Sequence, residues 1–209
     1  PLASLDVTGE RVGDALVEPA APATGAWHAL REWGIVVGIA LLVAVVIRTF
    51  AIAPFYIPSD SMFDTLSTDD RILVNKLSYR LHDVHRGDVV VFEKPPGVNF
   101  GSDEVEDLIK RVIGVPGDVL AFRDCSVFVN GQRLEEPYTD GQCTDPVGSA
   151  VDTDGDGEIT VPEDRYFVMG DNRRPNQSFD SRYWGFVDDE LIIGRAFVVI
   201  WPRGNWRWL

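Results

Sequence analysis

The chain has 209 residues, 45% of them hydrophobic and 25% charged, which is enough to bury a core and excludes a disordered or fibrous protein. Its 19 Lys and Arg residues stand against 33 Asp and Glu residues, for a formal net charge of -14. An acidic surface of this kind repels phosphate backbones, so no nucleic acid is expected among the partners.

The N-terminal part divides into a polar stretch and an apolar one. Residues 1–32 mix Pro, Ala and Gly with isolated charges and predict a flexible tail. Residues 33–53 are almost free of charge, with Arg48 near one end, where its side chain can reach lipid headgroups. At ~1.5 Å per residue this stretch can cross ~30 Å of bilayer hydrocarbon, which predicts one transmembrane helix.

Two alternatives compete with the transmembrane helix. A cleaved signal peptide would be followed by a small-x-small cleavage site, whereas Pro54 and Phe55 follow here. A helix packed in a soluble protein would expose a polar face to water, and this stretch has no such face.

Residues 54–209 predict one mostly β domain with antiparallel strands. Asn130-Gly131 lies between two short apolar runs and predicts a type I′ hairpin turn, because both central residues of that turn need a positive φ. The apolar segments are short, rich in β-branched residues and separated by Gly and Pro; they lie at 71–77, 88–93, 108–115, 127–134, 165–170 and 191–201.

Few side chains can act as a base. No histidine follows His85, and His82 and His85 lie in a polar, turn-like stretch, so a solvated loop explains them better than a Ser/His/Asp triad or a metal site. Lys110 lies inside the apolar segment LIKRVIGV, where burial would favour the neutral amine; a strand lysine that faces solvent is the alternative. Arg111 is expected to face the opposite side and to stay exposed.

Two candidate nucleophiles, Ser59 and Ser61, lie in a turn directly after the apolar stretch. A serine hydroxyl is inert until a neighbouring base accepts its proton, and a Ser/Lys pair meets that need. An ordinary turn without a catalytic role is the alternative.

Four blocks occur in one order along the chain: RTFAIAPFYIPSDSMFDTL (48–66), DRILVNKLSYR with RGDVVVF (70–92), DLIKRVIGVPGD (107–118) and GDNRRPNQSFDSRYWGFV (170–187). In these blocks the sequence resembles the bacterial type I signal peptidases, membrane-bound Ser/Lys proteases that remove signal peptides from exported proteins. Two features depart from that family: Asp64 stands where Pro is common, and the spacer RPNQ before Ser178 is longer than usual.

The resemblance implies a role for each matching residue. Ser61 would be the nucleophile and Lys110 the general base. The Ser61 amide and the Ser59 hydroxyl would form the oxyanion hole. The supporting residues would be Ser178, which orients the lysine amine, and Asp180 and Arg182, which buttress the site.

The resemblance also implies the substrates and the location. Exported preproteins would be cut after small residues of an Ala-x-Ala site, in an extended conformation against strand edges, without a cofactor or metal in catalysis. Residues 54–209 would lie on the extracytoplasmic side of the cytoplasmic membrane, with the tail inside. The shallow substrate pockets would be lined by Phe55, Ile57, Met62, Leu66, Leu108 and Ile109.

Two further features bear on this location. Cys125 and Cys143 would lie in an oxidising space and form a disulfide, with two free buried thiols as the alternative. Trp201, Trp206 and Trp208 would seat the domain on the lipid bilayer, with packing in an aromatic core as the alternative.

Residues 152–163, DTDGDGEITVPE, fit a calcium-loop pattern that flanking helices do not accompany. A structural calcium ion is therefore one expectation and an acidic solvated loop the other. The pattern positions are Asp152, Asp154, Asp156, Gly157 and Glu163.

Two other functions fit the sequence in part. A self-cleaving repressor of the same Ser/Lys type would need a DNA-binding head, whereas this chain has an apolar stretch there. A membrane-tethered binding module without catalysis would not need an intact Ser61, Lys110 and Gly170-Asp171-Asn172-Arg173.

Overall fold

The computed structural model describes residues 24–99, 106–147 and 157–209. Its first element is helix α1, Thr24–Phe50, in which 27 residues span ~40 Å. Within it, Trp27–Val45 has the length and composition to cross a membrane, and no part of that window is buried. Such a helix fits a membrane anchor.

The helix boundaries differ from the expected ones. Residues 24–32, expected in the flexible tail, are helical, because AWHALRE consists largely of good helix formers. Residues 52 and 53, expected in the transmembrane helix, belong to a β-strand, where Ile52 pairs with Asn75 and Ala53 with Val74. Residues 1–23 lie outside the described part of the chain. The division into tail, span and outer domain stays a prediction.

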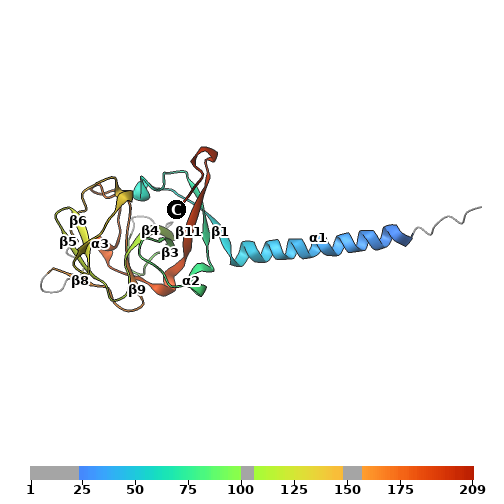
Figure 1. The fold of residues 1–209 in the computed structure, drawn as a ribbon, viewed down its shortest axis with the longest axis horizontal. Helices are drawn as coiled ribbons and strands as arrows, with labels where there is room; N and C mark the ends of the chain where they lie inside the picture. The colour runs from blue at the N-terminus through green and yellow to red at the C-terminus, as the bar shows by residue number, and fades with distance from the viewer. Residues whose placement is uncertain (1–23, 100–105, 148–156) are drawn as a thin grey trace, which may run out of the picture. The chain divides into compact units, whose positions relative to one another are not determined.

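The predicted antiparallel β architecture is confirmed (Figure 1). In the described residues, one sheet has the strand order β1-β2-β11-β3-β4-β9-β10, with β12 paired to β11, and a smaller sheet has the order β7-β6-β5-β8. The strands of the large sheet are β1 (Ile52–Tyr56), β2 (Arg71–Asn75), β3 (Val89–Glu93), β4 (Asp107–Gly114), β9 (Arg165–Met169), β10 (Val187–Asp188), β11 (Ile192–Trp201) and β12 (Arg207–Trp208). Those of the smaller sheet are β5 (Val119–Arg123), β6 (Ser126–Val129), β7 (Gln132–Arg133) and β8 (Ile159–Thr160).

Short helical elements connect the strands. They are the α-helices α2 (Ser78–Leu81) and α3 (Ser181–Trp184) and the 3-10 helices η1 (Asp60–Met62), η2 (Pro137–Thr139), η3 (Asp189–Leu191) and η4 (Arg203–Asn205).

The large sheet is buried on both faces, as the run VVVF in β3 illustrates. Val89 and Val91 pack in one hydrophobic cluster, whereas Val90 and Phe92 pack in another. Alternate residues of a strand point to opposite faces, so a run without alternation indicates that both faces are covered. Strands β3 and β4 thus hold the centre of the domain rigidly, and β4 carries Lys110 there.

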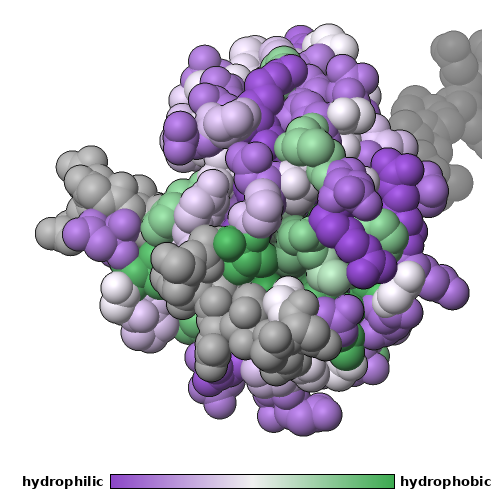
Figure 2. All heavy atoms as spheres, turned by 90° about the vertical axis from the view of Figure 1, so that its left-hand side faces the viewer, coloured by the Kyte–Doolittle hydropathy of each residue, from purple (hydrophilic) through white to green (hydrophobic). Residues whose placement is uncertain are grey.

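The smaller sheet has its own apolar core, which includes Leu120, Val127 and Phe167. The predicted hairpin joins β6 to β7, and Asn130 and Gly131 both have a positive φ, as a type I′ turn requires. The expected disulfide between Cys125 and Cys143 is present. Figure 2 shows the face of the domain over this sheet, where hydrophilic residues surround smaller apolar areas.

Candidate active site

Ser61 and Lys110 lie in direct contact although 49 positions separate them in the sequence. Lys110 Nζ lies 2.7 Å from Ser61 Oγ, within hydrogen-bond distance. Lys110 is on β4, opposite Val90 of β3, and Ser61 is in η1, directly after β1. Both side chains are largely buried, with 3% of Lys110 and 8% of Ser61 exposed. The two residues nominated by their chemistry therefore form a pair.

Burial determines the protonation state of Lys110. Desolvation lowers the pKa of its amine to about 8, against the opposing effect of the negative charges of Asp180 and Asp171. In the part of the chain that the structure describes, no carboxylate forms an ion pair with Lys110. With a pKa of about 8, roughly a tenth of the amine is neutral at pH 7, and this neutral form can accept a proton.

Asp180 is the centre of a buried cluster beside this pair. It caps the N-terminus of α3, and its carboxylate accepts hydrogen bonds from the guanidinium of Arg182 at 2.8 and 2.9 Å, from the Ser178 hydroxyl at 2.7 Å and from the Gly170 amide at 3.0 Å. Burial alone would raise the pKa of Asp180, but these bonds outweigh it and hold the pKa below its usual value. The Ser178 hydroxyl thus donates to Asp180, and its predicted action on Lys110 stays a prediction.

The expectation that Arg111 is exposed was wrong. Its side chain is only 11% exposed, and it donates two hydrogen bonds to Asp171, at 2.8 and 2.6 Å. The guanidinium also lies over the Tyr138 ring, 4.1 Å from its centre. Arg111 follows Lys110 in β4, and its side chain is buried because it pairs with the fully buried Asp171. The local sequence could not show that partner, which lies 60 positions away.

Sequence reasoning took Gly170, Asp171 and Asn172 as signs of an intact catalytic site but did not foresee their contacts with the turn that contains Ser61. The backbone N–H of Asn172 donates to the Ser61 carbonyl at 3.2 Å. The side-chain amide of Asn172 donates to the Asp60 carbonyl at 2.9 Å. A Cβ added at Gly170 would collide with the Ser61 carbonyl oxygen and the Ser178 hydroxyl, so only glycine fits. The run Gly-Asp-Asn after a strand was the available signal, since such runs approach other backbones closely.

The loop that contains the serines is also fixed at its ends. The Ile57 amide donates to the Asp70 carbonyl at 3.0 Å, and the Asp69 amide donates to the Ile57 carbonyl at 2.9 Å. From the C-terminal strand, Arg207 donates to the Thr65 carbonyl and pairs with Asp70 at 3.3 Å. The backbone around Ser61 is therefore held from several sides before a substrate binds.

Ser59, predicted to belong to the oxyanion hole, lies two positions before Ser61, and its role stays a prediction. It precedes η1 as its N-cap, but its side chain makes no capping hydrogen bond. Instead, its hydroxyl lies 3.4 Å from Ser61 Oγ and is on the exposed side of the turn. This arrangement leaves the hydroxyl able to turn toward an oxygen atom beside the nucleophile.

Five of the six predicted substrate-binding residues share one hydrophobic cluster: Phe55, Ile57, Met62, Leu66 and Ile109. Leu108 packs instead against a different cluster, that of Val90 and Phe92. Met62 and Leu66 are fully buried, so they can form only the floor of a pocket.

Other sequence candidates lie away from the pair or outside the described residues. His82 and His85 are exposed, and the described residues contain no cluster of His, Cys, Asp and Glu that could hold a metal ion. Asp152, Asp154 and Asp156 lie outside the described residues, whereas Gly157 and the exposed Glu163 are described. The calcium site stays a prediction.

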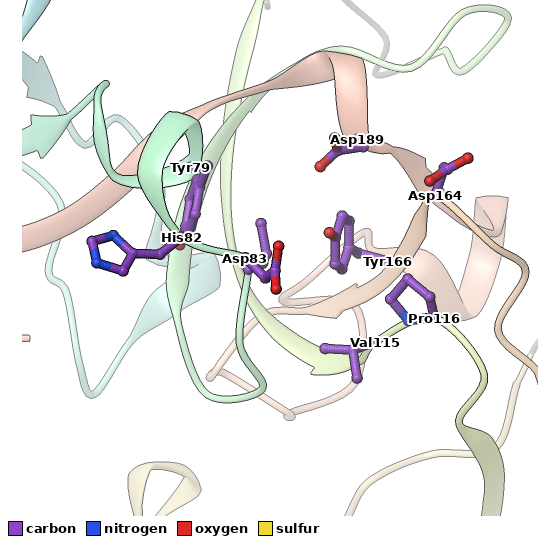
Figure 3. A pocket seen from close by; sticks show the side chains of 9 residues that line it. Tyr79, His82, Asp83, Val115, Pro116, Asp164, Tyr166 and Asp189 are labelled. Carbon is purple, nitrogen blue, oxygen red and sulfur yellow. The ribbon is translucent and has the colours of Figure 1, made fainter.

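A cavity of about 390 Å³ lies beyond the end of β4 (Figure 3). Its walls include His82, Asp83, Pro116, Tyr166 and Asp189. None of the predicted site residues lines it. The large cavity is therefore separate from the Ser61–Lys110 pair.

Comparison with known proteins supports a single family. The pattern of the family described as "Signal peptidase, peptidase S26" matches residues 30–201. The probable signal peptidase I-2 of Synechocystis sp. is 44% identical over 163 residues, which cover 78% of this chain and 69% of that protein. Signal peptidase I of Leptolyngbya laminosa is 40% identical over 186 residues, which cover 88% of this chain and 86% of that protein.

A solved structure is also similar. The signal peptidase I of Enterococcus faecalis V583 is 30% identical, covers 55% of this chain and 97% of its own, and has a TM-score of 0.41. The family pattern matches most of this chain. The identity to the Leptolyngbya laminosa protein, of which 86% is covered, supports the same family. The chain belongs to the signal peptidase family, peptidase S26, as a signal peptidase I enzyme.

Proposed function

We propose that this enzyme removes signal peptides from exported preproteins by cutting after an Ala-x-Ala site, with Ser61 as the nucleophile and Lys110 as the general base. The observation that carries the proposal is the 2.7 Å contact between Ser61 Oγ and a buried lysine amine that forms no ion pair with any described carboxylate. A buried Lys amine with a lowered pKa is the base that a serine nucleophile needs when no histidine is available.

The reaction would begin with proton transfer from Ser61 Oγ to Lys110 Nζ. The serine oxygen attacks the carbonyl carbon of the last signal-peptide residue and forms a tetrahedral oxyanion. The Ser61 amide and the Ser59 hydroxyl donate hydrogen bonds to that oxygen, and one such donor is worth ~3 kcal/mol of transition-state stabilisation. The ammonium of Lys110 then protonates the leaving amine.

Hydrolysis of the acyl-enzyme uses the same residues. Lys110 Nζ takes a proton from a water molecule, whose oxygen attacks the ester carbonyl, and the Ser61 oxygen recovers the proton as it leaves. Every proton in this cycle moves between oxygen and nitrogen atoms of the pair, the substrate and water. The proposed chemistry therefore uses no cofactor.

Two strand edges near Ser61 support binding of an extended substrate. Strand β1 is at the end of the large sheet, and residues 107–110 of β4 pair with β3 but not with β9, whose pairing begins at Arg111. Among the described residues, these backbone groups have a sheet neighbour on one side only. A peptide strand can add to such edges through its main chain, whatever its side chains.

The floor of the proposed pocket favours small side chains. Met62 and Leu66 are fully buried and Ile57 is 2% exposed, so the cluster that they form leaves little open space among them. A shallow space accepts Ala and excludes larger residues, which is the basis of the proposed Ala-x-Ala specificity. Leu108 lies in a different cluster and is the weakest member of the predicted pocket.

The proposed location is the cytoplasmic membrane, with the catalytic domain outside. The apolar helix and the disulfide both agree with it. The C-terminal tryptophans support contact with lipid, because Trp201, Trp206 and Trp208 are 48%, 68% and 78% exposed rather than packed in a core.

The test is cleavage of a preprotein with an Ala-x-Ala site by the detergent-solubilised full chain. Ser61→Ala and Lys110→Ala are compared with Ser67→Ala and Lys76→Met, which alter a serine of the same loop and a lysine outside the site. We expect cleavage after the second Ala by the parent and both controls, and a loss of roughly a thousandfold or more in the two active-site variants. A folded parent that does not cleave would favour the non-catalytic binding module.

A further inference from the structure

Arg173 is the most completely buried arginine near the site. Its polar groups bind to acceptors from Glu136, Gln142 and Thr144, which together are called the socket. None of its side chain is exposed. Its guanidinium pairs with Glu136 at 2.5 and 3.2 Å and donates to the Thr144 hydroxyl at 2.7 Å. Its backbone amide donates to the side-chain oxygen of Gln142 at 2.8 Å. A buried guanidinium needs such a set of acceptors, because each unpaired donor would cost free energy.

All three socket residues come from one segment, and the disulfide closes that segment. Glu136, Gln142 and Thr144 surround or precede Cys143, which is bonded to Cys125. The Thr144 amide also donates to the Cys125 carbonyl at 3.1 Å. A covalent link and a backbone hydrogen bond therefore fix the socket to the β5–β6 turn of the smaller sheet.

The other side of Arg173 contacts the active site. Its Nε donates to the Gly170 carbonyl at 2.8 Å. Gly170 fits between the Ser61 carbonyl and the Ser178 hydroxyl without room for a side chain, and its amide donates to Asp180. Close packing transmits a displacement, so a shift of Gly170 would move the nucleophile turn or the Asp180 cluster.

We propose that Glu136, with Gln142 and Thr144, is a positioning residue of the enzyme, and that it acts on Ser61 through Arg173 and Gly170. The disulfide keeps this socket in place. The inference rests on the proposed role of Ser61 and extends it to the segment 136–144, whose Gln142 side chain also reaches Asp64 at 3.5 Å.

Positioning predicts a particular kinetic change. A loosened socket would leave substrate binding intact and misplace Ser61, so kcat should fall while KM changes little. The acid limb of the pH profile should also move to higher pH, because looser packing would admit water to Lys110. The groups that face the amine are Asp171, Asp180 and Arg182, and none of them is altered in the test.

The experiment uses the full chain in detergent and a preprotein with an Ala-x-Ala site. Thr144→Val removes one socket acceptor at nearly constant volume, Glu136→Gln removes the charge, and dithiothreitol opens the disulfide. Asp188→Asn, which breaks the exposed pair with Arg165, is the matched control. We expect kcat to fall roughly tenfold or more in each of the three treatments, KM to stay within about twofold, and the control to match the parent. Reoxidation should restore kcat.

A double variant separates positioning from stability. In Glu136→Met with Arg173→Met, apolar side chains replace the buried pair, which commonly restores the melting temperature. A merely structural pair predicts that kcat returns with stability, whereas a positioning pair predicts that kcat stays low. This variant also covers the case in which Glu136→Gln does not fold.

The outcomes distinguish this inference from the proposed function. If the parent cleaves and the folded variants keep its kcat and pH profile, the inference is wrong and the proposed function stands. If the parent does not cleave, the proposed function fails, and the positioning role fails with it. A variant that loses kcat with an unchanged acid limb and regains it in the double variant would reduce the socket to a structural role.

Discussion

The interior beside Ser61 and the core of the smaller sheet are both well buried, but different forces hold them. The first contains Asp171, Arg173, Asp180 and Arg182, four charged residues that are each at most 2% exposed. The second is a cluster of aliphatic and aromatic side chains closed by a disulfide. Apolar packing tolerates small changes of shape, whereas buried charges are costly unless each partner is present.

The difference explains why no carboxylate among the described residues pairs with Lys110, as its proposed role as a base requires. Each acid near it has its own arginine, since Asp171 pairs with Arg111 and Asp180 with Arg182. The amine is therefore desolvated without being neutralised by a partner. In the polar interior, burial lowers the pKa of the Lys110 amine to about 8. A lysine exposed to water would not be desolvated, and its pKa would not be lowered in this way.

The largest expected effect comes from the pair itself. Lys110→Met should abolish cleavage, by roughly a thousandfold or more, yet raise the free energy of unfolding by about 1 to 3 kcal/mol at neutral pH. The gain follows because the unfolded chain binds the Lys110 proton more tightly than the folded one. Thermal unfolding of the two proteins checks this, and a less stable variant would contradict the desolvated amine. The gain should shrink as pH rises from about 8 to about 10.5.

Gly170→Ala tests the close approach of backbones in the polar interior. The added methyl group meets the Ser61 carbonyl oxygen, which belongs to the backbone and cannot turn away. We expect the free energy of unfolding to fall by about 2 kcal/mol or more and kcat by roughly a hundredfold. Gly131→Ala in the hairpin turn, which has open space around it, should leave kcat unchanged. A fully active Gly170→Ala would overturn the assigned packing.

The pH profile tests the state of Lys110 without any substitution. Only the neutral amine accepts a proton, so kcat/KM should rise with pH and level off above a pKa of about 8. Below that value the rate should fall about tenfold per pH unit. A rate constant that stays flat down to about pH 5 would exclude Lys110 as the base. The acid limb should shift to higher pH in Arg182→Met, which exposes the amine to an unpaired Asp180.

The smallest effect should come from the apolar core of the smaller sheet. Leu120→Val removes one buried methylene group, so the free energy of unfolding should fall by about 1 kcal/mol, with no change in kcat or in the pH profile. Chemical denaturation and the cleavage assay measure both quantities in one preparation. A loss of kcat here would show that the two regions are coupled by packing in general rather than through Arg173.

Sequence reasoning located most of the strands because their signals are local. The β-branched segments at 88–93 and 165–170 became β3 and β9, and Asn130-Gly131 became the expected turn. Strand β1 was not foreseen, because its residues continue the apolar stretch and only pairing with β2 makes them a strand. The short strands β8, β10 and β12 likewise depend on partners distant in sequence.

The site was foreseen in part for the same reason. The residue types of Ser61 and Lys110 indicate their chemistry, and the resemblance singles them out. The burial of Arg111 and the socket of Arg173 depend on partners 60 and 37 positions away, which no local pattern encodes. The close approach of Gly170 to the Ser61 carbonyl joins residues that are still farther apart in the sequence. The sequence alone does not show which charged residues pair with one another across long separations.

Strand β4 has a free edge along part of its length, which limits how many substrate residues can pair with it. Its free edge runs only from Asp107 to Lys110, since β9 takes over at Arg111. At ~3.3 Å per residue, that edge is a ruler of ~13 Å, or about four peptide units. A preprotein that pairs there, as proposed, would form main-chain hydrogen bonds with β4 over this length only, and β1 would be the other edge open to it. The apolar residues farther upstream in the signal peptide would make no contact with this edge, so signal peptides could vary freely there in all but their last few residues.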